Sequence, residues 1–307
     1  MEFHVERDVL LRSLTHIQGV VEKKNTLPIL SNVLIQATEE GLLVTATDMD
    51  MIISERINAN VKVNGSTTTG AQALYDVVRK LPSNSQLNFA LKDESKLKLI
   101  SGMSDYELTC LSSNEFPILE DNIEEEPTVI GSKQFLKLLN KTKFAISNDE
   151  TRHYLNGIYL GTDQNDKSKL IAVATDGHRL CKTLIEVQDM KNFQSIILPK
   201  KTIFELLTII GDENKDLKII STKSKIKFII DNIILISKVI DGKFPDYEKV
   251  IPKDERDEIK ADAIKFSNAL DRLRALSSDR KGVVKIKIEN NNITFNIKDI
   301  THGGGIE

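Results

Sequence analysis

Two short segments of the chain carry side chains that perform chemistry in many enzymes. Asp48 and Asp50 stand close together, and paired carboxylates of this kind can hold a divalent cation for phosphodiester cleavage. The run Thr175–Leu180, TDGHRL, combines a hydroxyl, a carboxylate and an imidazole. A catalytic triad needs such groups to converge from different segments, whereas neighbours on one turn point in different directions. We therefore expect a structural or binding loop at Thr175–Leu180. A metal-dependent nuclease or phosphoesterase that uses Asp48 and Asp50 stays an alternative.

The rest of the sequence offers little for catalysis. It contains no GxGxxG, GxxxxGK[ST], HExxH or GxSxG motif, and its five histidines are scattered. We expect no cofactor and no metal, and we expect the aspartates to stabilise turns. Cys110 and Cys181 form no CxxC pair and lie among apolar residues, which predicts buried free thiols in a reducing, cytoplasmic compartment. The apolar runs are too short to cross a bilayer, so no membrane partner is expected.

A long internal repeat organises the chain. Thr47–Asp48 is followed 69 residues later by Phe116–Pro117. In the same way, Thr175–Asp176 is followed 69 residues later by Phe244–Pro245. The two copies are offset by 128 residues, which is far longer than the period of a solenoid. One domain is therefore built twice, and a duplicated framework favours a scaffold over an enzyme with a single active site.

Hydrophobic periodicity predicts an α+β fold, with helices packed on antiparallel strands in each copy. The expected helices are 9–24, 72–81, 132–145, 199–210 and 262–276. The expected strands are 41–47, 96–100, 106–111, 170–174, 217–220, 225–230, 233–239, 284–288 and 293–297. Acidic, proline-containing stretches predict domain limits at 1–125, 126–253 and 254–307, of which the third is an incomplete copy.

The distribution of charge is more informative than the net charge of −3. The five predicted helices hold 14 lysines and arginines but only five acidic residues. If these helices share one surface, that surface attracts a polyanion, and the remainder of the protein repels it. The alternative is that the lysines only solvate the helices. No aromatic stacking platform accompanies the lysines, which favours contact with the nucleic-acid backbone over reading of bases.

Several short segments form a specific pattern when they are taken together. They are Thr26–Asn32, Thr45–Asp48, Tyr154–Gly157, Thr175–Leu180 and Asp241–Tyr247. At this spacing they closely resemble the bacterial DNA polymerase III beta subunit, the sliding clamp. The resemblance runs from Met1 to about Ile297, without the C-terminal part of the family's third domain.

The resemblance implies a DNA clamp with three similar domains in each subunit. Two subunits of such a clamp join head to tail into a homodimeric ring, whose helices face duplex DNA and whose sheets form the outside. The ring is a non-catalytic processivity factor, which tethers the replicative polymerase and also binds the clamp loader and other replication and repair proteins. Loose contacts with phosphates suit this role, because base-specific contacts would stop sliding. A peptide-binding adaptor that never encircles DNA is a further alternative.

The resemblance also implies sites for partners. The family docks a short hydrophobic peptide in a pocket between its second and third domains. The matching positions here are Arg152, Tyr154, Leu155, Thr175, Gly177, His178, Arg179, Leu180, Pro245, Lys249 and Val250. Lys249 stands where an arginine is common, which removes a bidentate contact. The family's C-terminal strand, which forms one wall of the pocket, is absent from this sequence.

For DNA and for ring closure, further positions match. The DNA-binding positions are Lys24, Arg79, Arg152, His153, Tyr154, Lys200 and Lys201. Asp149 stands where some members of the family have a neutral polar residue, and the aspartate weakens the contact with DNA at this position. The dimer interface would bring Tyr106 and Leu108, on an edge strand, against Ala275 and Leu276 of a second copy. An internal strand at Tyr106–Leu108 is the alternative.

Overall fold

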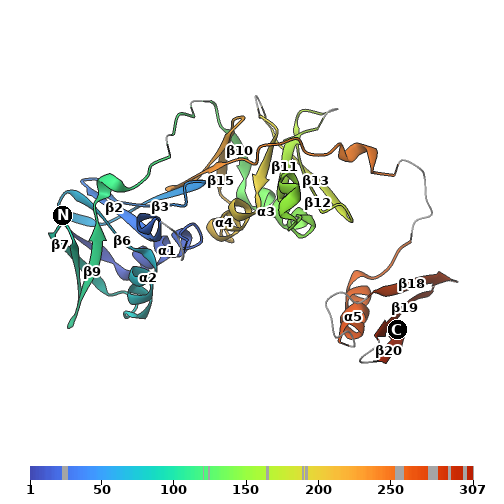
Figure 1. Cartoon of the computed structure of the whole chain (residues 1–307), viewed down its shortest axis with the longest axis horizontal. Coiled ribbons are helices and arrows are strands. Elements are labelled where there is room, and N and C mark those ends of the chain that lie inside the picture. The colour runs from blue at the N-terminus through green and yellow to red at the C-terminus, as the bar shows by residue number, and fades with distance from the viewer. Residues whose placement is uncertain are drawn as a thin grey trace. The chain divides into compact units, whose positions relative to one another are not determined.

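The computed structural model describes most of the chain as two compact units. The described residues are 1–22, 27–119, 121–123, 125–163, 166–188, 190, 193–252, 259–275, 283–289, 292–299 and 303–306. The units are Met1–Tyr247 and Glu248–Glu307, and each combines helices with antiparallel strands (Figure 1). The α+β fold predicted from the sequence is therefore confirmed. None of the helices in these ranges has both the length and the apolar character that crossing a membrane requires.

The first repeat occupies the N-terminal half of the larger unit. Its elements are β1 Glu2–Glu6, α1 Arg7–Ile17, η1 Pro28–Ser31, β2 Asn32–Thr38, β3 Gly41–Thr47, β4 Met51–Ile57, β5 Asn60–Val63, β6 Gly65–Gly70, α2 Ala71–Lys80, β7 Gln86–Asp93, β8 Lys96–Ser101, β9 Ser104–Leu111 and η2 Ser113–Glu115. The guanidinium group of Arg7 donates hydrogen bonds to the carbonyls of Val78 (2.9 Å) and Arg79 (2.5 Å). These bonds satisfy backbone carbonyls at the C-terminal end of α2, and so fix α1 against α2.

The second repeat follows with the same order of helices and strands, except that its described residues hold no counterpart of β5. Its elements are β10 Thr128–Gly131, α3 Ser132–Thr142, η3 Lys143–Ala145, η4 Glu150–Leu155, β11 Gly157–Thr162, β12 Lys169–Thr175, β13 Leu180–Glu186, β14 Ile196–Pro199, α4 Lys200–Ile209, β15 Asp216–Ser221, β16 Lys225–Ile230 and β17 Ile233–Lys238. By this order β12 corresponds to β3, β13 to β4, α4 to α2, and β17 to β9. The short helix η5, Tyr247–Lys249, comes after β17.

One antiparallel sheet joins the two repeats. It contains thirteen strands in the order β10-β15-β16-β17-β4-β3-β2-β6-β9-β8-β7-β1-β5. The step from β17 to β4 crosses from the second repeat to the first, with the register running from Ile233↔Glu55 to Ser237↔Met51. A second sheet has four strands in the order β13-β12-β11-β14. The boundary between the repeats is therefore bridged by backbone hydrogen bonds, and the two repeats form one compact unit.

Four helices of the larger unit pack one beside the next. Helix α2 contacts α1, α1 contacts α4, and α4 contacts α3 (Figure 1). Their apolar faces bury large side chains against the sheets, as Phe135 of α3 does against Phe228 of β16, with ring centroids 5.8 Å apart. Their polar faces point away from this core. The row α2–α1–α4–α3 is therefore one continuous helical surface built from both repeats.

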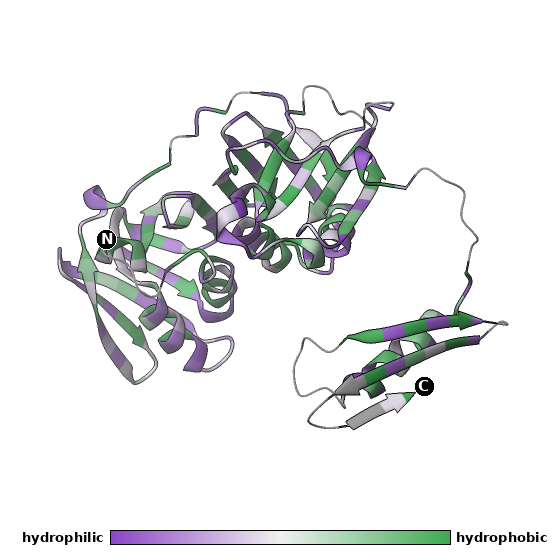
Figure 2. Ribbon diagram, turned by 45° about the vertical axis from the view of Figure 1, so that its right-hand side comes forward, coloured by the Kyte–Doolittle hydropathy of each residue, from purple (hydrophilic) through white to green (hydrophobic). Residues whose placement is uncertain are grey.

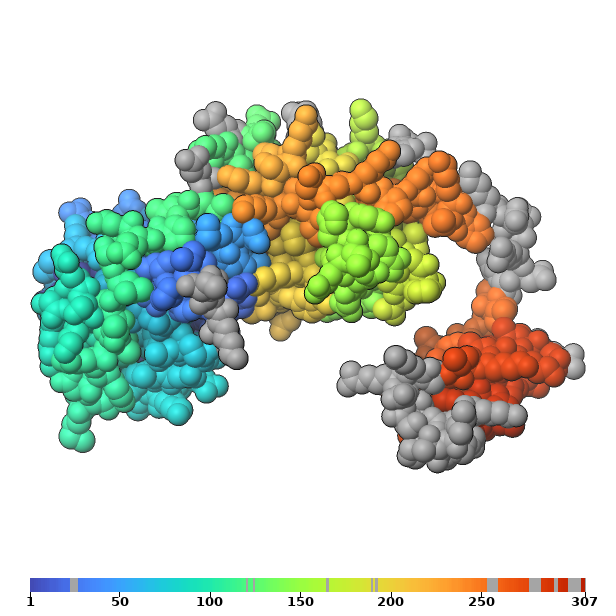
Figure 3. Space-filling view, in the orientation of Figure 1, coloured from blue at the N-terminus to red at the C-terminus, as the bar shows by residue number. Residues whose placement is uncertain are grey.

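A surface segment follows β17 in the larger unit. Figure 3 shows it lying across the second repeat. Ile240 donates its backbone N–H to the carbonyl of Ile197 at 3.0 Å, and the ring of Phe244 is buried. The segment is thereby held against the four-stranded sheet up to Tyr247.

The smaller unit contains one helix and three strands. They are α5 Ala263–Arg274, β18 Val284–Glu289, β19 Asn292–Asp299 and β20 Gly303–Ile306, with the strand order β18-β19-β20. The carboxylate of Asp262 accepts hydrogen bonds from two backbone N–H groups and caps the start of α5. Figure 2 shows polar and apolar residues alternating along β18. The core is small, with Leu273 and Phe295 among its few buried side chains.

Most of the predicted elements are confirmed, with differences at their ends. Helix α1 ends at Ile17 instead of residue 24, and Gly19 follows one position beyond its C-cap. Several strands escaped prediction, including β4 and β13, because neither shows the alternation of polar and apolar residues that marks a half-buried strand. Strand β4 is buried at five of its seven positions, and β13 has no buried residue. Residues 253–258, at the predicted limit between the second and third domains, lie outside the described residues, as does the turn between β18 and β19.

The prediction for the two cysteines was only half right. Cys110 is buried, and burial raises the pKa of its thiol. Cys181 is only partly buried, because β13 lies at the edge of its sheet. Its Sγ lies 3.0 Å from the carbonyl oxygen of Lys141.

Candidate functional site

The two Thr-Asp turns have the same hydrogen bonds. Thr47 Oγ1 donates to the carbonyl of Met51 at 2.8 Å and accepts from the N–H of Met49 at 3.0 Å. Thr175 Oγ1 donates to the carbonyl of Arg179 at 2.7 Å and accepts from the N–H of Gly177 at 3.1 Å. The duplicated sequence thus folds into a duplicated turn, which connects β3 to β4 in the first repeat and β12 to β13 in the second.

The aspartates close the same turns. Asp48 Oδ1 accepts from two backbone N–H groups at 2.9 and 2.7 Å, and Asp176 Oδ1 accepts from two at 2.9 and 3.0 Å. The bond from the backbone N–H of His178, followed by that of Arg179, holds the pKa of Asp176 below its usual value. The predicted turn role of the aspartates is therefore confirmed. Within the described ranges, no three His, Cys, Asp or Glu side chains come close enough to form a metal site.

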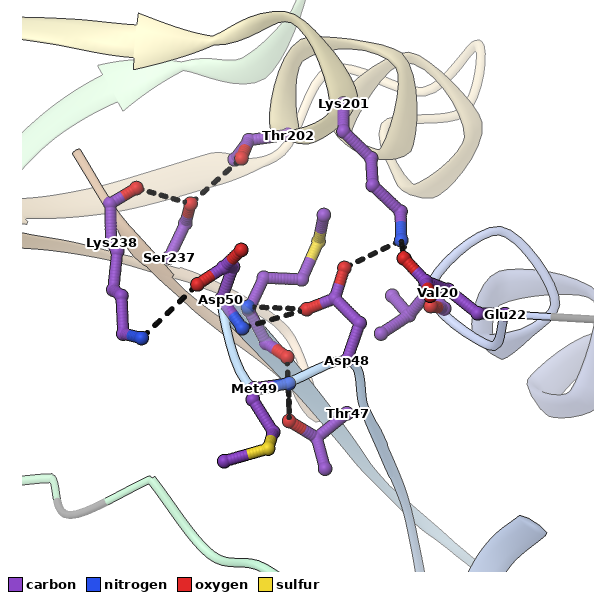
Figure 4. Close-up of polar contacts among 11 residues, drawn as sticks. Val20, Glu22, Thr47, Asp48, Met49, Asp50, Lys201, Thr202, Ser237 and Lys238 are labelled. Atoms are coloured by element: carbon purple, nitrogen blue, oxygen red, sulfur yellow. Dashed lines mark hydrogen bonds and ion pairs between the residues drawn. The ribbon is translucent and has the colours of Figure 1, made fainter. Parts of the chain in front are cut away.

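The two turns differ in the partner of the second carboxylate oxygen of the aspartate. Asp176 Oδ2 accepts from Nε of Arg179, on its own turn, at 3.0 Å. Asp48 Oδ2 instead accepts from Nζ of Lys201, on α4 of the other repeat, at 2.5 Å (Figure 4). The side chain of Asp48 is 5% exposed and that of Asp176 is 23% exposed. The first turn is therefore an internal contact between repeats, and the second lies near the surface.

An apolar cluster lies beside the second turn. We call it the Phe244 cluster, and its buried members are Leu155, Ile171, Val173, Ile197 and Phe244. The ring of Tyr159 stacks on that of Phe244 with centroids 5.4 Å apart. Leu180 and Tyr154 pack against the same cluster. Three predicted pocket residues, Leu155, Leu180 and Tyr154, are therefore brought together on an apolar base.

Arg152 links the η4 helix to the second turn. Its Nε donates to Asp149 Oδ2 at 2.9 Å. Its Nη1 lies 2.8 Å from the position that a Cβ atom would take on Gly177, whose φ is +90°. Hydrogen bonds from Thr151 and Arg152 hold the pKa of Asp149 below its usual value. Asp149, which we expected to weaken DNA binding, thus orients Arg152 toward the turn.

The remaining predicted pocket positions are exposed. His178, Arg179 and Pro245 are open to solvent, and the guanidinium of Arg179 lies 5.4 Å from the ring centroid of Phe144. Lys249 and Val250 are also exposed, but they belong to the smaller unit. Their part in a pocket stays a prediction.

The row of helices carries exposed basic side chains. On α3, Lys133, Lys137 and Lys141 are exposed, and none of them has an ion pair in the described part of the chain. On α2, Arg79 is exposed beside Tyr75 and Asp76. Exposed basic side chains are therefore present on α2 and α3, the first and last helices of the row, whereas the fifth predicted helix, α5, belongs to the smaller unit.

The residues predicted to bind DNA differ in their surroundings. Lys200 is exposed, and its Nζ donates to Asn148 Oδ1 at 2.5 Å. His153 is also exposed, with its ring edge-on to that of Tyr154. Lys24 lies outside the described residues. Lys201 has a different environment from the one expected, because its ammonium group points into the contact between the repeats (Figure 4).

The predicted ring-closure residues lie on β9. Tyr106 and Leu108 are paired with Leu99 and Leu97 of β8, and their side chains pack into the core. Among the described strands, residues 104–109 of β9 pair with β8 alone, which leaves the other backbone edge open. What this segment offers a partner is therefore its backbone more than its side chains. Ala275 is exposed at the end of α5, and Leu276 lies outside the described residues.

The sequence analysis missed several residues of this region. Phe244, Tyr159 and Tyr247 form an aromatic group on the Phe244 cluster, with Tyr159 and Tyr247 ring centroids 5.9 Å apart. The repeated Phe-Pro dipeptide marked Phe244 as a shared feature of both copies, but gave no indication of what its ring contacts. The contact joins a surface segment to a strand that is distant in sequence.

Duplicated α+β repeats with a basic row of helices and a joined sheet define a DNA-clamp fold. The models for the N-terminal and central domains of the DNA polymerase III beta subunit match residues 1–120 and 129–246. The beta sliding clamp of Caulobacter vibrioides is 36% identical over 310 residues, which cover 100% of this chain and 83% of that protein. The chain therefore belongs to the family of beta sliding clamps, and so to the accessory, non-catalytic subunits of DNA polymerase III.

Solved structures agree with this assignment. The sliding clamp of Bartonella birtlesii, in a structure with bound griselimycin, has a TM-score of 0.94 and is 35% identical, covering 100% of this chain and 83% of that one. The sliding clamp of Bacillus subtilis has a TM-score of 0.92 and is 27% identical, with the same coverage. These matches support a clamp over a metal-dependent nuclease.

Proposed function

We propose that the chain acts in a ring that encircles duplex DNA and tethers the replicative DNA polymerase to it. The observation that carries the proposal is the row α2–α1–α4–α3, which brings exposed basic side chains of both repeats, Arg79 on α2 and the lysines of α3, onto one surface. Charge of this kind attracts phosphates without regard to sequence. The polymerase then stays bound to the template through the ring, while each contact with DNA remains weak.

Retention on circular DNA tests encirclement directly. A topological clamp, once loaded, stays on a nicked circle and is lost when the circle is cut, whereas an adaptor binds circular and linear DNA equally. Equal retention on both substrates would therefore favour the adaptor and contradict the ring. Sedimentation equilibrium at micromolar concentrations reports the dimer in the same samples.

The basic surface has a matched control within the chain. We expect Lys133→Gln, Lys137→Gln and Lys141→Gln together to lower the salt dependence of DNA binding, by up to about 0.9 in log–log slope for each lysine that contacts phosphate. The control removes Lys92, Lys96 and Lys98 on β7 and β8, where each forms an ion pair on the sheet side. Equal effects of the two triple variants would contradict a specific role for the helices.

The join between the repeats supports a model for ring closure. Strand β4 of the first repeat pairs with β17 of the second. The counterpart of β17 in the first repeat is β9, whose edge at residues 104–109 is open in the described part of the chain. We propose that this edge, with Tyr106 and Leu108, faces the third domain of a second copy near Ala275 and Leu276. A proline at Glu107, which removes a backbone donor from β9, is expected to weaken the dimer.

A second site is proposed for the polymerase and other clamp-binding proteins. The Phe244 cluster supplies an apolar base, and the turn at Thr175–Leu180 supplies an exposed rim, which suits a short hydrophobic peptide. Leu155→Ala with His178→Ala is expected to weaken binding of such a peptide by about tenfold or more. The control is Leu184→Ala, on the same strand as Leu180 but 45% exposed and outside the cluster. Unchanged affinity in a folded double variant would contradict this site.

The domain limits 1–125, 126–253 and 254–307, and a cytoplasmic location, complete the proposal. The matches at 1–120 and 129–246 support the first two limits. The cytoplasm is where a bacterial chromosome is replicated. Fractionation of cells that express a tagged chain would test the location, and recovery in the membrane fraction would contradict it.

A further inference from the structure

The contact between the two repeats has a polar centre on its helical side. Lys201 Nζ donates to the carbonyl of Val20 at 3.1 Å and to Asp48 Oδ2 at 2.5 Å, and it lies 3.8 Å from Glu22 (Figure 4). Val20 and Glu22 follow α1, and Asp48 belongs to the turn after β3. One ammonium group from α4 thus holds two separate segments of the first repeat.

Glu205 lies one turn further along α4 and faces the same segments. Its side chain is buried, and a Cβ atom on Gly19 would overlap its carboxylate group. Glycine at position 19 therefore allows this close approach. Burial raises the pKa of Glu205 to about 7, Lys201 lowers it, and Asp48 raises it further.

Within the described residues, two buried or nearly buried carboxylates, those of Asp48 and Glu205, lie near Lys201. The groups that act on Glu205 are Lys201, on its own helix, and Asp48, on the turn. Elsewhere at the junction, His16 Nδ1 lies 3.0 Å from Glu55 Oε2, and Lys238 Nζ lies 3.0 Å from Asp50 Oδ1. When Glu205 is ionised, it therefore competes with Asp48 for Lys201.

We propose that Lys201 is a positioning residue that latches the second repeat to the first, and that loss of a proton from Glu205 loosens this latch. The β4–β17 pairing joins the repeats through the sheet and acts as the hinge. The latch lies on the other side, where α1 meets α4. With Glu205 neutral, Asp48 holds Lys201 without competition. With Glu205 charged, its repulsion from Asp48 and its poor solvation are relieved when α4 moves away from Gly19.

The latch sets the angle between the repeats, and so the curvature of the row α2–α1–α4–α3. The inference concerns the junction alone and does not depend on the proposed ring. It also gives Lys201 a role other than contact with phosphate. Lys200, its neighbour, is exposed and has no contact with the first repeat in the described part of the chain, which makes it the matched control.

The distance between the repeats is the quantity to measure. Spin labels at Arg12→Cys on α1 and Lys137→Cys on α3, in a chain with Cys181→Ser, report it by pulsed electron spin resonance. We expect a narrow distance distribution at pH 6 that broadens with a midpoint near pH 7. In Glu205→Gln the distribution should stay narrow at pH 6 and at pH 8. A width that is the same at both pH values in the unmodified sequence would overturn the proton-sensitive part.

The role of Lys201 is tested in the same labelled chain. Lys201→Met is expected to broaden the distribution at both pH values, and Lys200→Met to leave it unchanged. Equal distributions in these two variants would overturn the latch. If Lys201→Met fails to fold, Lys201→Arg decides the matter, because a retained cation should restore the narrow distribution, and a broad one would contradict the latch.

Discussion

The two Thr-Asp turns are built alike but are used differently. Both hold their backbone through the same threonine and aspartate hydrogen bonds. In the first turn the side chain of Asp48 is nearly buried, and its free carboxylate oxygen binds Lys201 on α4 of the next repeat. The second turn is exposed, and its free oxygen binds its own Arg179. The two copies thus share a backbone motif, and the partner of one carboxylate oxygen differs: in the first copy it joins the two repeats, and in the second it stays within the turn.

Replacing the aspartate by alanine should give the largest difference in unfolding free energy between the two turns. Asp48→Ala loses two backbone bonds and a nearly buried ion pair, and it should cost about 3–4 kcal/mol of unfolding free energy. Asp176→Ala loses bonds of the same kind at a more exposed turn and should cost about 1–2 kcal/mol. Urea denaturation of the two variants measures the difference. Equal losses would show that the contact with Lys201 adds nothing to the first turn.

The pH dependence of stability should report the junction. The pKa of Glu205 is raised to about 7 from 4.5, so the folded chain binds this proton more tightly than the unfolded chain. The proton on Glu205 therefore makes its full contribution to the free energy of unfolding below pH 4.5, and this contribution is lost as the pH rises through about 7. At pH 8, Glu205→Gln should be more stable than the original by at most about 3 kcal/mol.

The control for this experiment is an exposed glutamate on the other side of the sheet. Glu107→Gln removes a carboxylate whose pKa is lowered by its bonds with Lys92 and Lys96. Its stability should not show a gain between pH 6 and 8. A gain for Glu107→Gln equal to that for Glu205→Gln would indicate a general effect of net charge.

A side chain at Gly177 should strain the open turn. Gly177 has φ +90°, where residues with a Cβ atom are strained, and the added atom would also displace the Arg152 guanidinium. Gly177→Ala should cost about 1–2 kcal/mol of unfolding free energy. It should also weaken peptide binding, measured by fluorescence polarisation. A variant of unchanged stability would contradict the strain.

The converse change in the first turn should have the smallest effect. Met49 occupies the position of Gly177 with φ 73°, so the first turn already holds a side chain in the left-handed region. Met49→Gly removes the cost of a side chain in the left-handed region, but glycine also makes the unfolded chain more flexible. The net stabilisation should be about 0.5 kcal/mol. Thermal unfolding measures it. A clear loss of stability would mean that the half-exposed Met49 side chain contributes more by packing than the strain costs.

The sequence predicted what local pattern and repetition can express. The strand 41–47 and the helix 72–81 agree with β3 and α2 to within one residue, because their apolar periodicity is regular. The turn role of Asp48 was also predicted, and Asp176 makes the same backbone bonds in the second copy. By contrast, the pairing of β4 with β17 joins residues that are distant in sequence, and no local pattern encodes such a contact.

The residues of the candidate sites also differ in how well the sequence predicted their surroundings. Leu155 and Leu180 were placed by resemblance, and they pack on one cluster. Lys201 has the residue type and helix position of a phosphate contact, but its partners are set by where α1 ends. That position depends on tertiary packing, so the sequence alone did not distinguish Lys201 from Lys200.

The shared sheet also constrains how the chain is made. Met51 and Ser237 pair across the junction but are 186 positions apart. At bacterial rates of synthesis, β4 emerges from the ribosome roughly 10–40 s before β17. During that interval the nascent first repeat presents an unpaired, largely apolar strand edge, which is a template for aggregation. A chaperone that covers the edge of β4 during this interval would therefore protect the nascent chain from aggregation.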